Sequence, residues 1–145
     1  MARGLFVGLT SVDIFNVVDT HPLPNQKIKA RHQAVSAGGP AANAAVAFCS
    51  FGNDTDLLTG IGRHPTGALA FEDLRSHGVR VLDYSAHPDK LPVLSSILID
   101  ASSGSRCVVY RSPQGRTLCL DQRHGCPVED YQIMLFDGYY LEQAV

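Results

Sequence analysis

Short apolar runs separated by turn residues dominate the first third of the chain. Residues 4–9 form one such run, bounded by glycine, and predict a strand buried on both faces. Residues 14–18 and 27–35 follow as two extended segments, and the two prolines and the asparagine of residues 21–25 mark a turn between them. Because the segment 27–35 alternates imperfectly and carries several basic residues, we expect it on a solvent-facing strand outside the main sheet.

Two segments have the features of helices. Residues 40–51 begin with proline, which is favoured at the first helical position, are rich in alanine, and stop before Gly52, where a left-handed cap is expected. Residues 66–77 place apolar side chains at helical spacing and stop before Gly78.

The remaining apolar runs predict further strands. They cover residues 56–62, 79–84 and 133–136, and residues 94–100 and 106–111 read as a hairpin joined by a Ser- and Gly-rich turn. The last run is expected to be buried and ends at Asp137 and Gly138. This order of strands and helices predicts an α/β fold with an additional β layer.

Composition narrows the class of protein. With 145 residues, 45% hydrophobic and 18% charged, the chain has the size and character of one soluble globular domain. The formal net charge of -2 argues against nucleic acid or an anionic membrane as partner, and no apolar run approaches the ~20 residues that span a bilayer. The four irregularly spaced cysteines are expected to be thiols of a reducing, cytoplasmic compartment, and neither they nor the six histidines suggest a metal site.

Three features lie where open α/β sheets bind ligands, at the carboxyl ends of strands. Asp13 follows the first apolar run, the pair Gly38 and Gly39 opens the first helix, and Asp137 follows the last strand. A carboxylate accepts hydroxyl hydrogens, and glycine lets a ligand reach the free N–H groups of a helix start. Asn43, in the first turn of that helix, offers both a donor and an acceptor, so the set suits a polyol better than a phosphate.

Each feature also has a purely structural interpretation. Asp13 alone is readily explained as a turn residue, and the glycine pair alone is equally well explained as a tight helix entrance. Lys27, Lys29 and Arg31 are typical of a solvated face. The loop is not a dinucleotide fingerprint, because the pattern G-x-G-x-x-G is absent.

Taken together, the spacing of these residues resembles the N-terminal signature of the ribokinase/PfkB family of carbohydrate kinases. Gly38, Gly39, Asn43, Ala45, Gly52 and Gly62 fall at the family's intervals, and "GLTSVD" resembles the first strand with its substrate-binding aspartate. The resemblance covers nearly the whole chain and looks strongest to the ketohexokinase and sulfofructose kinase branch.

The resemblance implies a ribokinase-like three-layer α/β sandwich, present in part, with a small β-sheet lid over the sugar site. Residues 1–145 would then form the N-terminal, substrate-binding portion of the kinase domain, with lid strands at about 14–36 and 94–111. The C-terminal nucleotide-binding half, which carries the G-A-G-D motif with the catalytic base, is expected to be absent, since the motif does not occur in the sequence.

The resemblance also implies site residues and cofactors. Asp13, Gly38, Gly39 and Asn43 would bind the sugar, and Lys27 and Arg31 would contact it from the lid. ATP with Mg²⁺ would be the phosphate donor, but its site is not expected in this chain, and no catalytic or metal-binding residue is assigned. The expected function is therefore that of an ATP-dependent sugar kinase of which this chain is the sugar-binding part, inactive by itself.

A second hypothesis is a non-catalytic sugar-binding or dimerisation module derived from the same family. The lid would then pair with a second copy of the chain or with a full-length kinase. Under both hypotheses the ligand is a small-molecule sugar, without nucleic acid or membrane as partner.

Overall fold

The chain is described by a computed structural model, which defines residues 1–111, 118 and 128–140. A four-stranded parallel sheet has the order β5-β4-β1-β8, with β1 at Arg3–Val7, β4 at Asp54–Thr59, β5 at Arg80–Asp83 and β8 at Ile133–Phe136. β1 is central and pairs in parallel with both β4 and β8. The α/β class predicted from the sequence is confirmed.

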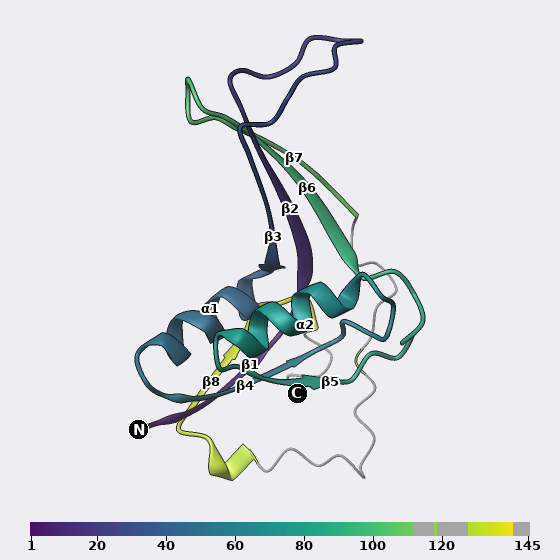
Figure 1. Cartoon of the computed structure of the whole chain (residues 1–145). Helices are drawn as coiled ribbons and strands as arrows, with labels where there is room; N and C mark the ends of the chain where they lie inside the picture. The colour runs from purple at the N-terminus through teal and green to yellow at the C-terminus, as the bar shows by residue number, and fades with distance from the viewer. Residues whose placement is uncertain (112–117, 119–127, 141–145) are drawn as a thin grey trace.

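Two helices cover one face of this sheet (Figure 1). α1 spans Pro40–Ser50 and α2 spans Gly67–Ser76. α1 turns its buried alanines, Ala41, Ala42 and Ala45, toward the sheet, and their small side chains allow close packing on Phe6 and Leu57. Both helices end as predicted, because Gly52 and Gly78 adopt positive φ just beyond them.

A second sheet projects away from the helices and the parallel sheet (Figure 1). Its order is β3-β2-β6-β7, with β2 at Ser11–Val18, β3 at His32–Gly38, β6 at Val93–Asp100 and β7 at Arg106–Tyr110. β2 pairs antiparallel with β3 and parallel with β6, and β6 and β7 form the predicted hairpin. The second sheet contains strands within the segments predicted for the lid, at about 14–36 and 94–111, and its role as a lid over a sugar stays a prediction.

The two sheets are joined by very short connections. Only Gly8, Leu9 and Thr10 separate β1 from β2, and only Gly39 separates β3 from α1. The hydroxyl of Thr59, at the end of β4, donates to that of Thr10 at 2.9 Å, and both threonines are buried. The base of the second sheet is therefore fixed to the carboxyl ends of the parallel strands.

Three details differ from the sequence predictions. Asp13 lies inside β2 rather than just past the first strand, because the chain turns at residues 8–10 and resumes as a strand at Ser11. Residues 27–31 are a loop, and the strand expected from residue 27 begins at His32. β8 is partly exposed rather than buried, with Ile133 44%, Met134 39% and Phe136 37% accessible, since it forms an edge of the described sheet.

The other face of the parallel sheet carries a second apolar cluster. Leu5, Val7 and Leu58 pack there with Leu118 and Tyr140. Of the three expected layers, the described residues thus contain the sheet and one helical layer. Among the cysteines, Cys49 is half-buried and Cys107 exposed, while Cys119 and Cys126 lie outside the described residues.

Candidate ligand site at the base of the second sheet

Asp13 lies at the base of the second sheet, where β2 begins. Its Oδ1 accepts a hydrogen bond of 2.7 Å from the hydroxyl of Ser11, which is itself buried. Because Ser11 and Asp13 are two residues apart on one strand, their side chains lie on the same face. The serine therefore fixes one carboxylate oxygen and leaves Oδ2 facing away from it.

Gly38 provides the space that this carboxylate occupies. A Cβ atom at position 38 would lie 2.0 Å from Asp13 Oδ2 and 2.4 Å from its Cγ, much closer than non-bonded atoms approach. Gly38 pairs with Ser11 across the antiparallel ladder, diagonally opposite Asp13. The glycine is thus required by the aspartate, a relation that the sequence spacing alone does not reveal.

Gly39 forms the junction between β3 and α1. Its φ of 105° lies in a region that favours glycine, and a Cβ there would lie 2.2 Å from the carbonyl oxygen of Leu9. Asn43 follows one helical turn later, and its backbone N–H donates to the carbonyl of Gly39 at 2.9 Å. The Asn43 side chain is exposed at this end of the helix.

Asp137, at the end of β8, also contacts the junction between β3 and α1. Its Oδ2 accepts hydrogen bonds from the backbone N–H of Leu9 at 2.8 Å and of Ala41 at 3.3 Å. Gly8 is needed here, since a Cβ at position 8 would lie 2.2 Å from the Asp137 carboxylate. Asp137 therefore holds the start of α1 against the β1–β2 turn, and one N–H group that was expected to be free for a ligand is already engaged.

Two other carboxylates also accept hydrogen bonds from backbone N–H groups. Asp83 accepts from the N–H groups of Ile61 and Gly62, both at 2.9 Å. Asp73, on α2, accepts from the N–H of Ala37 at 2.7 Å. Asp13 differs from these carboxylates, because in the described part of the chain its single side-chain partner is the Ser11 hydroxyl. It retains the capacity to accept hydrogen bonds from a ligand.

The two predicted lid contacts lie far from this carboxylate. Lys27 and Arg31 are exposed in the loop between β2 and β3, at the end of the second sheet opposite its base. The backbone N–H of Arg31 bonds to the carbonyl of Val17, four residues beyond Asp13 along β2, and its guanidinium pairs with Asp19. Their contact with a ligand stays a prediction.

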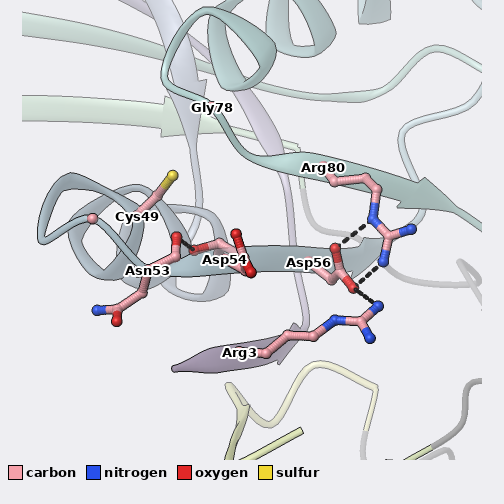
Figure 2. A pocket seen from close by; sticks show the side chains of 9 residues that line it. Arg3, Cys49, Asn53, Asp54, Asp56, Gly78 and Arg80 are labelled. Carbon is pink, nitrogen blue, oxygen red and sulfur yellow. Dashed lines mark hydrogen bonds and ion pairs between the residues drawn. The ribbon is translucent and has the colours of Figure 1, made fainter. Parts of the chain in front are cut away.

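A separate hollow of about 500 Å³ opens at the opposite edge of the parallel sheet, where the strands begin (Figure 2). Asp56, with a side chain only 4% exposed, receives hydrogen bonds there from Arg80, Arg3 and Tyr131. Burial raises the pKa of the Asp56 carboxyl, but the bonds from Arg80, Tyr131 and Arg3 outweigh this effect and the pKa lies below its ordinary value. Arg3 also pairs with Asp130 at 3.6 Å, so two carboxylates balance the two guanidinium groups, and the network joins the starts of the strands.

The described residues also bear on metal and membrane binding. Across residues 1–111, 118 and 128–140, no three His, Cys, Asp or Glu side chains gather to hold a metal ion. Over the same residues, no helix has the length and apolarity that crossing a bilayer requires.

Comparison with known proteins assigns the fold to a family. Residues 1–143 match the family model described as pfkB family carbohydrate kinase. A solved structure of a candidate ribokinase from Agrobacterium tumefaciens superimposes with a TM-score of 0.83, at 25% identity, over 99% of this chain and 46% of that one. The ribokinase of Cryptococcus neoformans var. grubii serotype A, solved in complex with ADP, has a TM-score of 0.65 at 19% identity, over 99% of this chain and 43% of that one.

Two curated proteins are also similar in sequence. The ATP-dependent ribose-1-phosphate kinase of Halopiger xanaduensis is 37% identical over 79 residues, covering 54% of this chain and 27% of the relative. The ribokinase of Dictyostelium discoideum is 26% identical over 103 residues, covering 71% and 32%. This chain thus matches about a third or less of either relative. It belongs to the pfkB family of carbohydrate kinases.

Proposed function

We propose that the base of the second sheet binds a sugar, as the substrate-binding part of an ATP-dependent carbohydrate kinase. The observation that carries this proposal is the state of the Asp13 carboxylate. Ser11 orients it, Gly38 makes room for it, and its remaining acceptor positions are not used by the described residues. A sugar supplies the hydroxyl donors that such a carboxylate accepts.

Gly39 and Asn43 complete the proposed site. Gly39 lets the chain turn from β3 into α1 against the carbonyl of Leu9, and the exposed Asn43 amide can both donate and accept. These groups bind and orient, and they bring no acid, base or nucleophile to the reaction. ATP, in its family role, would supply the transferred phosphoryl group, and we assign no residue of this chain to the nucleotide.

Membership of the family does not by itself identify the sugar that the site binds. The relatives reported above are named for ribose or ribose 1-phosphate, whereas the sequence motifs favour the ketohexokinase and sulfofructose kinase branch. Both D-ribose and D-fructose are therefore the appropriate first ligands.

Replacement of Asp13 tests the proposal. We expect the 145-residue chain to bind D-ribose, D-fructose or both in a ligand-observed NMR titration, and Asp13→Asn to weaken that binding by about tenfold or more, because a charge-assisted acceptor is lost. Asp89→Asn is the matched control, since Asp89 is 84% exposed and, among the described residues, its side chain pairs with Arg63 alone. Equal affinities of the two variants for the sugar would refute the assignment.

The second candidate function is a dimerisation module, and one observation favours it. The face of the second sheet opposite Asp13 carries exposed apolar side chains, namely Val35 at 47%, Ile14 at 36% and Val109 at 74%. Such a face is suited to contact with a second copy of the chain.

A further inference from the structure

A row of polar side chains crosses the second sheet at the level of Asp13. In the strand registers, Ser36 on β3 pairs with Asp13 on β2, Asp13 pairs with Ser95 on β6, and Ser95 pairs with Tyr110 on β7. Partners in register stand on the same face of a sheet, about 5 Å apart. The Asp13 carboxylate is therefore flanked by one serine hydroxyl on each side, with a phenol beyond.

The next row, farther from the glycine junction, is apolar. It consists of Ala34, Phe15, Ile97 and Val108, which are likewise partners in register and lie on the same face. Ile97 is buried and Phe15 is half-buried. This face of the sheet thus presents a band of hydroxyl and carboxylate groups beside a band of hydrocarbon.

The two serine hydroxyls are available to a ligand. Ser36 and Ser95 are half-buried, and within the described part of the chain neither hydroxyl bonds to another residue. A serine hydroxyl both donates and accepts hydrogen bonds, whereas a carboxylate only accepts them. The row can therefore act as donor or as acceptor toward the hydroxyl groups of a ligand. The one formal charge in the two rows is the negative charge of Asp13, which would repel a phosphate or sulfonate placed there.

We propose that Ser36 and Ser95 are specificity-determining residues of the sugar site. They bind hydroxyls that neighbour the one held by Asp13, while Phe15 and Ile97 pack against the C–H face of the sugar. The inference rests on the proposed function and narrows its substrate class to a neutral polyol whose hydroxyls at the second sheet are unsubstituted.

Removal of each hydroxyl tests this role. We expect Ser36→Ala and Ser95→Ala each to raise the dissociation constant for the better-bound of D-ribose and D-fructose about three- to tenfold, as for one lost neutral hydrogen bond. Ser96→Ala is the matched control, because Ser96 is the next residue of β6, is exposed and points to the opposite face. It should bind like the wild type.

Three further measurements separate ligand binding from stability. Ser95→Thr keeps a hydroxyl and suits a strand, so it should retain much of the affinity that Ser95→Ala loses. Thermal melts of all variants should agree, since the hydroxyl has no described protein partner. A monodeoxy analogue lacking the contacted hydroxyl should bind wild type and Ser95→Ala equally.

The outcomes distinguish the assignment of the two serines from the sugar site itself. If Asp13→Asn loses binding but Ser36→Ala and Ser95→Ala bind like Ser96→Ala, the serine assignment is overturned and the sugar site stands. If the wild type binds neither sugar, or if Asp13→Asn binds as tightly as the wild type, both are overturned. Tighter binding of D-ribose 5-phosphate or D-fructose 6-phosphate, lost in the serine variants, would contradict the neutral substrate class.

Discussion

At the scale of single residues, two glycines and two aspartates occur as interdependent pairs. Gly38 makes room for Asp13, and Gly8 makes room for Asp137. In each pair the carboxylate fills the volume that a side chain on the glycine would take. The sequence shows that these residues are present, but the pairing becomes visible only when the strands are in register.

The Gly38–Asp13 pair predicts that substitution of Gly38 lowers sugar affinity, whereas substitution of a glycine outside this pair lowers stability alone. In Gly38→Ala the new methyl group would displace the Asp13 carboxylate, so we expect sugar affinity to fall about tenfold with the loss of a charge-assisted bond. Gly52→Ala is the complementary control, because Gly52 has a φ of 80° and no atoms near its Cβ position. It should lower stability by about 1 kcal/mol and leave binding unchanged.

Calorimetric melts and NMR titration of both variants check this expectation. Wild-type sugar affinity in Gly38→Ala would show that the Asp13 carboxylate need not keep its described position.

At the scale of elements, the starts of the parallel strands are joined by Asp56. Its partners come from β1, β5 and the segment before β8, so one buried carboxylate connects parts of the chain from residue 3 to residue 131. Arg3 also lies over the ring of Tyr131, with its guanidinium carbon 4.7 Å from the ring centre.

We expect this network to contribute acid-sensitive stability. The folded protein holds the pKa of Asp56 below its ordinary value of 3.8, so its contribution is complete above that pH and is lost as the pH falls through the lowered value. Asp56→Asn should reduce the free energy of unfolding by about 2–3 kcal/mol at pH 7, and by progressively less below pH 3.8.

Urea unfolding between pH 7 and pH 2.5 measures the difference. Asp54→Asn, two residues earlier on the same strand and exposed, should change stability little. If the free energies of unfolding of the wild type and Asp56→Asn differ by a constant amount down to pH 2.5, the stabilisation by Asp56 is not ionic in origin.

At the scale of the whole molecule, the sequence predicted the order of elements and the helix ends well. Proline, alanine and glycine act locally, and the bounds of α1 follow from them. The position of β3 was less predictable, since the basic residues from Lys27 to Arg31 alternate like a strand but form a loop. The backbone role of Asp137 depends on a contact across 128 residues, which no local pattern contains.

The apolar outer face of the second sheet predicts self-association. We expect the chain to sediment in part as a dimer, and Val109→Glu to shift it toward the monomer, because a charge would be placed among Val35, Ile14 and their counterparts. Phe51→Glu is the control, since Phe51 is 83% exposed just after α1, at the opposite end of that helix from β3. A wild type that is monomeric at all concentrations tested would remove the basis for the dimerisation module.

The pairing of β1 with β8 has a consequence for synthesis on the ribosome. β1 precedes the other described strands along the chain, yet one of its two edges receives its partner only when Ile133–Phe136 has been made. Until then that edge stays open, although β4 and α1 can already cover the opposite edge and one face. Domains fold as their parts emerge during translation, so β1 completes its pairing only after the other described strands have emerged. A nascent chain arrested before residue 133 would therefore expose β1 to other strands, and a chaperone that binds extended apolar segments would find it there.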